Sequence, residues 1–240
     1  LKESLNSLKD QTYKNWELIF VDNFSKDNSY EIFKQANDKR FNYFRTNKKL
    51  KLYHARKIAI KKCRGQYVCF LDTDDLWKKN KLYYQINFLR KKRCEILYSK
   101  FDINEISKKK KYINIKKNLP SGFITQSLLN NYTIGILTVF LKTEILNKNN
   151  FNEKYTIIGD FDLFIRLSQK YKIYSLNKSL ATYRIHQNNL SKKRLDIYVK
   201  EMKTWLSLNE KSLVKYDLSK LRFFILKLKI KKFLNFFKNS

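Results

Sequence analysis

Glycine, proline and cysteine are scarce in this chain of 240 residues. It holds four glycines and one proline, which excludes collagen-like sequences and other repeats built on these residues. Its three cysteines, Cys63, Cys69 and Cys94, are an odd number without the spacing of a metal site, so no disulfide framework is expected. The chain is therefore predicted to work in a reducing compartment.

Long hydrophobic runs are absent as well. No stretch approaches the ~18 unbroken apolar residues of a membrane span, and no charged and then apolar leader resembles a signal peptide. Hydrophobic residues still make up 43% of the chain and aromatic residues 15%, which is enough to fill a core and excludes disorder through weak hydrophobicity. We expect a folded, cytoplasmic protein.

Acidic residues are few beside the basic ones. The chain has 21 Asp and Glu against 52 Lys and Arg, a formal net charge of +31. This charge is typical of proteins that bind nucleic acid or anionic phospholipid. The lysines are spread along the whole chain, however, and no DNA- or RNA-binding motif accompanies them, so a solvated surface is the simpler interpretation. We expect no nucleic-acid partner, and an anionic membrane surface stays an open alternative.

Short apolar segments alternate with helical patterns through the first hundred residues. The segments of strand length are residues 16–21, 41–45, 67–71 and 96–99. A helix is expected between each consecutive pair, the last of them over residues 77–90. This alternation predicts an α/β fold with a mixed, mostly parallel sheet flanked by helices. Ligands of such sheets bind beyond the carboxyl ends of strands, where Asp22 and Asp72–Asp75 stand.

The second half of the sequence is less regular. The expected elements are a charged hairpin or loop over residues 108–117, a helix over 160–171, and strands over 173–176 and 181–184. From Leu195 onward the pattern is helical and basic. Because no repeat and no Pro- or Gly-rich linker is present, we predict one domain over residues 1–194 and a basic helical tail over residues 195–240.

Three carboxylates lie within four residues at Asp72-Thr73-Asp74-Asp75. Carboxylates this close repel one another unless positive charge neutralises them, and a divalent metal ion is the usual solution. Mg²⁺ and Mn²⁺ take oxygen ligands, often one or two carboxylates together with substrate phosphates. The simpler alternative is that Asp74 or Asp75 caps a helix beginning at Trp77. Capping accounts for one acid at most, so the run favours a metal and phosphate site.

The same residues belong to a series of motifs that resembles family 2 glycosyltransferases of the GT-A fold. Residues 11–27 resemble the family's Q-T-Y-x-N-x-E-[LI]-I-x-V-D-D-G-S-x-D opening, and residues 55–72 its A-R-N-x-A-I…G-x-Y-[IV]-x-F-L-D block. Asp72–Asp75 matches the family's D-x-D-D motif. The likeness covers residues 4–190 in order. It implies a Rossmann-like GT-A sheet and transfer of a sugar from a nucleotide-diphosphate donor, with a UDP-sugar expected first.

The resemblance implies roles for the acids at the strand ends. Asp22 would contact the nucleobase of the donor, while Asp72 and Asp74 would serve the ribose and a Mn²⁺ or Mg²⁺ ion. Asn23 and Phe24 stand where the family has Asp and Gly. The loop is therefore bulkier than usual, which leaves the identity of the base open.

The resemblance also implies a general base. Residues 158–167 resemble the family's E-D-[YW]-D-L-W-L-R-L segment, in which Asp160 takes the place of the base and Gly159 replaces the customary Glu. Inverting transfer needs such a carboxylate to accept the proton of the acceptor hydroxyl. Asp162 is the nearby alternative. Asp160 would also serve as an N-cap of the following helix, and the two roles are compatible.

Two further residues are predicted near the diphosphate. Residues 183–191 resemble the family's Y-R-x-H-x-x-S-x-S ending, which makes His186 a ligand of the metal or a contact of the diphosphate. Lys51 stands where the family has a small or a basic residue and would reach the diphosphate. For Lys51 a plain surface position is the simpler interpretation.

Both ends of the chain carry an expectation. The family's first strand, an apolar run ending in P-x-Y-N, is expected before Leu1, so we predict that ~10 residues, about one strand and turn, are missing there. In the tail, one helical face holds Leu226, Ile230, Phe233 and Phe237, with lysines on the other faces. Such a helix is typical of shallow binding at a membrane interface, and packing onto the first domain is the alternative.

The sequence as a whole predicts a metal-dependent, inverting glycosyltransferase. It would move a sugar from a nucleotide-diphosphate donor to a glycan or lipid-linked acceptor in cell-envelope polysaccharide synthesis, in the cytoplasm or on the inner face of the plasma membrane. A nucleotidyltransferase is the second enzyme class, but no Gly-rich phosphate loop near the first strand supports it. The alternative from another class is a basic module that binds nucleic acid or membrane without catalysis.

Overall fold

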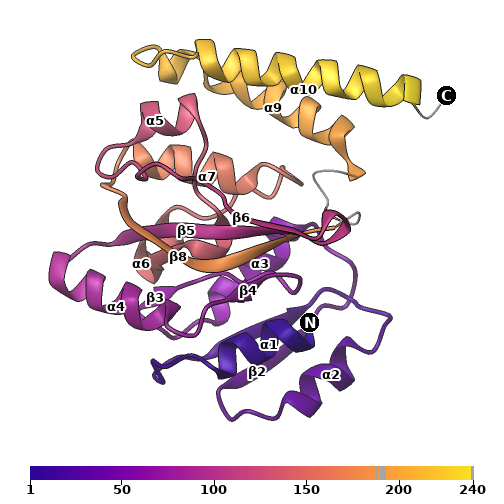
Figure 1. Ribbon diagram of the computed structural model, residues 1–240, viewed down its shortest axis with the longest axis vertical. Helices are drawn as coiled ribbons and strands as arrows, with labels where there is room; N and C mark the ends of the chain where they lie inside the picture. Colours follow the sequence, from indigo (N-terminus) through magenta and orange to yellow (C-terminus); the bar gives the residue numbers. More distant parts are fainter. Residues whose placement is uncertain (187–188, 190–192, 239–240) are drawn as a thin grey trace.

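The computed structural model of the chain describes residues 1–186, 189 and 193–238 (Figure 1). A mixed sheet crosses the middle of the molecule, with a small two-stranded sheet and helices α1 and α2 at one end and helices α9 and α10 at the other. The predicted α/β class is confirmed.

The two-stranded sheet pairs β1 (Leu18–Asp22) with β2 (Phe41–Arg45) in parallel. Helix α2 (Ser29–Ala36) connects the two strands, and Phe33 from this helix lies 5.0 Å from the ring of Phe20 and 5.2 Å from that of Tyr43. This aromatic cluster fixes α2 on the sheet. The sheet ends at Asp22, opposite Arg45.

The larger sheet has six strands in the order β3-β7-β5-β8-β4, with β6 paired to β5. The long strands β5 and β8 are parallel, and the other pairings are short and antiparallel. The bounds of the strands are β3 Tyr67–Val68, β4 Leu76–Trp77, β5 Ile96–Glu105, β6 Lys110–Ile113, β7 Phe140–Lys142 and β8 Tyr174–Ile185.

The remaining elements are helices that cover the sheets, and their bounds follow the apolar spacing of the sequence. They are α1 Lys2–Lys9, α3 Leu52–Lys62, α4 Lys81–Lys92, α5 Thr125–Asn130, α6 Thr143–Lys148, α7 Gly159–Ser168, α9 Leu195–Asn209, α10 Ser219–Lys238, and the 3₁₀ turns Ile106–Lys108, Ile136–Thr138 and Lys211–Leu213. No helix in the described ranges is long and apolar enough to cross a membrane.

Helices α9 and α10 share a hydrophobic core with the rest of the chain. Met202 and Trp205 of α9 are 1% exposed, and Leu221 and Ile225 of α10 belong to the same buried cluster. The indole N–H of Trp205 donates to Asp162 Oδ1 at 2.9 Å, which ties α9 to α7. One core therefore continues on both sides of residue 194, and a division into two domains at that point stays a prediction.

Some element boundaries differ from those expected. Trp77 lies in β4 and not in a helix, because Leu76 and Trp77 pair with Thr182 and Ala181 of β8 and the indole N–H of Trp77 donates to the Leu137 carbonyl at 2.9 Å. Residues 173–176 and 181–184 belong to a single strand, β8. Pairing with strands far away in the sequence decided both boundaries, and the local pattern of the sequence does not reveal such partners.

Candidate active site

One cleft of about 2130 Å³ collects the acids that follow the strands. Its lining includes apolar residues of β1 and residues 68–71. Asp22, Asp72, Asp74 and Asp160 all line this cleft. Four of the six residues predicted to form the site, from three separate segments of the sequence, thus meet in one place.

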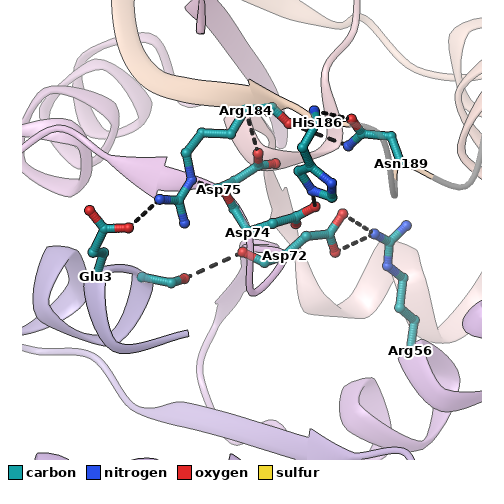
Figure 2. Close-up of polar contacts among 9 residues, drawn as sticks. Glu3, Arg56, Asp72, Asp74, Asp75, Arg184, His186 and Asn189 are labelled. Atoms are coloured by element: carbon teal, nitrogen blue, oxygen red, sulfur yellow. Dashed lines mark hydrogen bonds and ion pairs between the residues drawn. The ribbon is translucent and has the colours of Figure 1, made fainter. Parts of the chain in front are cut away.

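The Asp72–Asp75 segment forms a turn in which the backbone N–H of Asp75 donates to the Asp72 carbonyl at 3.0 Å. Its three carboxylates have three different partners: Arg56, His186 and the backbone of Arg184 (Figure 2). None of them caps a helix, because α4 begins at Lys81. The capping interpretation is therefore wrong, and the turn displays Asp72 and Asp74 toward the cleft.

Asp72 is held by a cation from α3. Arg56 Nη2 lies 2.6 Å from Asp72 Oδ1 and 2.9 Å from Asp72 Oδ2. The Arg56 side chain is 10% exposed and the Asp72 side chain 39%. The rings of Tyr53, Phe70 and Phe151 surround the guanidinium at 5.5 to 5.9 Å. Apolar surroundings strengthen an ion pair of this kind, so Arg56 fixes the orientation of Asp72 while leaving it open to a ligand.

Asp74 and His186 form the second contact. His186 Nε2 lies 2.8 Å from Asp74 Oδ2, and both side chains are partly exposed. Asn189, three residues after His186, braces the histidine: the backbone N–H of His186 donates to Asn189 Oδ1 at 2.6 Å. Asn189, which stands where the family has a serine, donates in turn to the Arg184 carbonyl. The predicted pair of metal-site residues is thus brought together from segments 112 positions apart.

Asp75 is the buried acid of the turn and supports its shape. Its side chain is buried and accepts the backbone N–H of Arg184 at 3.0 Å. Burial raises the pKa of Asp75 to about 8, with the charges of Asp72 and Asp74 adding to the rise and the Arg184 N–H opposing it. The Arg184 side chain donates to the Asp74 carbonyl and pairs with Glu3 of α1. The end of β8 is thereby locked onto the aspartate turn.

Asp22 lies at the opposite side of the cleft, at the end of β1. It is 3% exposed, and its carboxylate accepts the Ser25 backbone N–H at 2.7 Å and the hydroxyl of Tyr43. Burial raises the pKa of Asp22, but these hydrogen bonds and the nearby Arg45 outweigh it and lower the pKa below its usual value. Asp22 is therefore a fixed anion at the ends of β1 and β2, and its oxygens accept hydrogen bonds there.

Asp160 lies in the first turn of α7. Its Oδ1 accepts the backbone N–H of Phe161 at 2.9 Å and lies 3.3 Å from the hydroxyl of Tyr53. Tyr53 also donates to the Ile157 carbonyl at 2.7 Å. Burial raises the pKa of Asp160, and the charge of Arg56 limits the rise. A carboxylate whose pKa is shifted toward neutrality is suited to accept a proton from a hydroxyl.

The glycine before Asp160 has a structural reason. A Cβ at Gly159 would lie 2.6 to 2.7 Å from three ring atoms of Tyr53. The glutamate that the family motif has at this position would collide with the ring in the same way. Gly159 and Tyr53 therefore form a matched pair, in which the tyrosine hydroxyl approaches Asp160 from the side that the glycine leaves open.

Two residues considered in the sequence lie elsewhere. Asp162, the alternative base, is buried and accepts Trp205 Nε1 at 2.9 Å and Arg166 Nε at 3.0 Å, so its oxygens serve the contact between α7 and α9. Lys51 is exposed at the start of α3, donates to the Lys154 carbonyl at 3.3 Å and does not line the cleft. A diphosphate contact of Lys51 stays a prediction that this position does not favour.

The donor groups fit a weakly held hard cation. Within the described part of the chain, no group of three or more His, Cys, Asp or Glu residues is arranged to hold a metal ion. Mg²⁺ and Mn²⁺ often use only one or two protein ligands, with water and substrate phosphates completing the shell. Asp74 supplies an oxygen at the cleft, and His186 supplies a nitrogen 2.8 Å from that carboxylate, which matches that smaller set.

Three residues of the site were not assigned a role from the sequence: Arg56, Tyr53 and Arg184. The motifs contained the two arginines, in the segments that match A-R-N-x-A-I and Y-R-x-H. Basic residues are so common in this chain that charge alone could not single them out. Tyr53 gives no signal in the sequence, because its place beside Asp160 depends on the packing of α3 against α7.

Known proteins resemble this chain in sequence. The model of the family described as Glycosyl transferase family 2 matches residues 1–156. TuaG of Bacillus subtilis, named as a teichuronic acid biosynthesis glycosyltransferase, is 28% identical over 88% of this chain and 82% of its own length. The Escherichia coli protein WfgD, a UDP-Glc:alpha-D-GlcNAc-diphosphoundecaprenol beta-1,3-glucosyltransferase, is 30% identical over 80% of this chain and 74% of its own length.

Solved structures show the same fold. TarS of S. aureus in complex with UDP-GlcNAc superposes with a TM-score of 0.68 at 18% identity. The complex of TarS with UDP gives 0.65 at 20% identity. Both cover 92% of this chain, and this chain spans 64% and 63% of the two TarS chains.

Proposed function

The chain belongs to glycosyl transferase family 2, and we propose that it moves one sugar from a UDP-sugar to a glycan or lipid-linked acceptor, with inversion at the anomeric carbon. The family and the GT-A-like α/β fold predicted from the motifs are confirmed, as is the prediction that the chain is a glycosyltransferase. The donor, the metal ion, the stereochemistry and the roles of single residues are the proposal. The observation that carries it is the meeting of Asp22, Asp72, Asp74 and Asp160 in one cleft.

The donor would lie along the acids of the cleft. Asp22, at the end of β1, would accept N–H groups of a nucleobase, and Asp72 would accept the ribose hydroxyls; both line the cleft. Carboxylates suit both tasks because they only accept hydrogen bonds when ionised. A uridine nucleotide is supported by the printed names of the similar proteins: UDP and UDP-GlcNAc in the TarS complexes and UDP-Glc in WfgD.

The diphosphate would lie beside Asp74 and His186. A Mn²⁺ or Mg²⁺ ion held by these two side chains would stabilise the negative charge that develops on the departing diphosphate. This chain's own contribution is the orientation of the two ligands: Asn189 fixes the backbone of His186, and the Arg184 side chain holds the carbonyl of Asp74.

The transfer step would use Asp160 as the general base. Asp160 accepts the proton of the acceptor hydroxyl while that oxygen forms a bond to the anomeric carbon of the sugar. The bond from this carbon to the diphosphate oxygen breaks on the opposite face, and the electron pair leaves with the diphosphate. Tyr53 orients the carboxylate of Asp160. The raised pKa of Asp160 lies closer to the operating pH than that of an ordinary aspartate.

The acceptor class follows from the relatives. TuaG is named for teichuronic acid biosynthesis, AmsB of Erwinia amylovora for amylovoran biosynthesis, and WfgD for a diphosphoundecaprenol-linked acceptor. We infer for this chain an acceptor in cell-envelope polysaccharide synthesis, carried on a lipid and met at the inner face of the plasma membrane.

The test is a calorimetric titration of a panel of nucleotide sugars with and without Mn²⁺, followed by turnover measured with the best donor. Asp74→Ala should abolish the Mn²⁺-dependent part of binding. Asp160→Asn should bind the donor as the unchanged protein does and lower turnover by ~10²-fold or more. Asp196→Asn, on the exposed surface of α9, is the matched control and should leave both quantities unchanged.

Several outcomes would count against the proposal. Donor binding that ignores Mn²⁺ and Asp74→Ala would remove the metal site, and full turnover by Asp160→Asn would remove the base. A product with retained anomeric configuration, read by NMR, would exclude inversion. Binding of DNA that falls steeply with salt, together with no binding of any nucleotide sugar, would favour the basic module without catalysis.

A further inference from the structure

Helix α10 has two apolar faces, and only one of them is used inside the protein. Leu221, Ile225 and Leu228 are 3%, 4% and 8% exposed and belong to the main hydrophobic cluster. Their spacing of four and three residues defines one stripe along the helix, which packs toward α9 and α5. Packing against the rest of the chain, one of the two expectations for this helix, therefore takes place on this stripe.

The second face points away from the protein. Phe223, Leu226, Ile230 and Leu234 are 57%, 48%, 50% and 55% exposed. They follow one another at intervals of three and four residues, so they form a continuous apolar stripe on the side of the helix opposite Ile225. Of the face expected from the sequence, Phe233 is 63% exposed, and the side chain of Phe237 lies outside the described residues. We call Phe223, Leu226, Ile230 and Leu234 the outer stripe.

Basic residues border the outer stripe on both sides. Lys220, Lys227 and Lys231 lie along one edge by their helical spacing, and Arg222 and Lys229 along the other. Helix α10 contains no acidic residue. Acidic charge near it comes from Glu210, which pairs with Arg222. An apolar stripe between two cationic edges matches the boundary of an anionic lipid leaflet, where acyl chains lie beneath negative headgroups.

Other occupants fit this surface less well. Nucleic acid would use the lysines but would leave the four apolar side chains of the outer stripe in water or against phosphates. A second copy of the chain would cover the apolar side chains but would bring two rows of lysines together, and like charges at short range repel. Lipid satisfies both the apolar and the charged residues.

We propose that α10 is a membrane-docking helix, which inserts the outer stripe between the headgroups of an anionic leaflet while its inner stripe stays in the protein core. The docking surface is independent of the transfer reaction, since none of its residues lines the cleft. It requires no change of the fold, because the outer stripe is exposed already.

Docking through α10 would also set the direction of the cleft. In Figure 1, α10 lies at one end of the long axis, β2 and α2 lie at the other, and α7 lies between α10 and the sheets. Helix α7 carries Asp160 in its first turn. The acceptor side of the cleft would then face the lipid and the nucleobase side the solvent. This consequence, unlike the docking itself, rests on the proposed function.

The experiment measures binding of the full chain to phosphatidylglycerol-containing vesicles and to pure phosphatidylcholine vesicles, without nucleotide. Leu226→Gln/Ile230→Gln should weaken binding to anionic vesicles on the order of 10- to 30-fold. The control Tyr83→Gln/Ile113→Gln changes two side chains of equal exposure, 50% and 47%, on α4 and β6 and should bind normally. Lys227→Gln/Lys231→Gln should weaken binding about 10-fold at low salt, and Lys91→Gln/Lys92→Gln, at the end of α4, should not.

Four results would overturn the proposal. The first is equal binding of the chain to both kinds of vesicle, or binding to neither kind. The second is binding of the α10 variants that equals that of their controls. The third is conversion of a dimer into a monomer by Leu226→Gln/Ile230→Gln, seen in sedimentation, with vesicle binding unchanged. This result would assign the outer stripe to a second copy of the chain. The fourth is full competition of duplex DNA with vesicles for the unchanged protein but not for Lys227→Gln/Lys231→Gln. This result would assign the lysines to nucleic acid. Donor binding, measured in parallel, should be unchanged in every variant, so failure of docking is distinguishable from failure of the transfer function.

Discussion

Replacing Gly159 by alanine tests the packing that orients Asp160. The added Cβ would lie 2.6 to 2.7 Å from the ring of Tyr53, far inside van der Waals contact. The ring cannot retreat freely, because it is 2% exposed, stacks on Phe151 at 5.3 Å and is anchored by its hydroxyl to Ile157. The strain must therefore be taken up by the start of α7 or by the ring.

The size of the effect follows from the two costs involved. Overpacking of this kind lowers the free energy of unfolding by about 1–3 kcal/mol. Removing the ring with Tyr53→Ala costs about 3–5 kcal/mol by itself. In the Tyr53→Ala background, however, Gly159→Ala has room and should be neutral or stabilise by up to about 1 kcal/mol, since alanine is the better helix former. The two changes should thus couple by at least about 1 kcal/mol.

Urea unfolding of the two single variants and the double variant measures this coupling. As a control, Tyr155→Ala removes another buried ring, 7% exposed, which is not among the nearest atoms to Gly159. Gly159→Ala should cost the same in that background as in the unchanged protein. Equal costs of Gly159→Ala with and without the Tyr53 ring would refute the reasoning.

Two further predictions concern buried cations. The charge of Arg56 limits the rise in the pKa of Asp160, so Arg56→Met should raise that pKa further and shift the acid limb of the turnover–pH profile to higher pH. The exposed Arg64→Met should not shift this limb, and an unmoved limb in Arg56→Met would contradict the assignment of Asp160. Burial lowers the pKa of Lys81, whose Nζ donates to Gln85 at 2.6 Å, to about 8. Between pH 8 and 10.5 the unfolded chain holds this proton and the folded chain does not. The free energy of unfolding should therefore rise with pH by up to about 3 kcal/mol relative to that of Lys81→Met, measured by guanidinium unfolding. Parallel curves of this free energy against pH for the two proteins would refute the prediction.

The acids of the cleft could be found from the sequence because their signal is local. Asp72–Asp75 follows an uncharged segment, and Asp22 and Asp160 stand in motifs whose spacing is preserved. The choice between Asp160 and Asp162 was open, since both lie in the first turn of the same helix. The tertiary structure separates the two: Asp162 accepts a hydrogen bond from Trp205 in the core, and Asp160 lines the cleft.

The partners of these acids could not be found in the same way. Arg56 is one of 52 basic residues, and only its position beneath Asp72 distinguishes it. The departure at Gly159 could be noticed but not explained, because the ring that requires it comes from a helix more than a hundred positions earlier. Trp77 reads locally as the start of a helix and became a strand through pairing with β8.

The amino-acid sequence by itself thus determined the α/β class, the family, the acids that converge on one cleft and the helical character of the last segment. These depend on short-range periodicity and on motifs of fixed spacing. Only the tertiary structure decided which carboxylates line the cleft, which cations hold them, and which of the two apolar stripes of α10 belongs to the core. Each of these depends on contacts between residues far apart in the chain, and periodicity within one segment carries no information about the other partner.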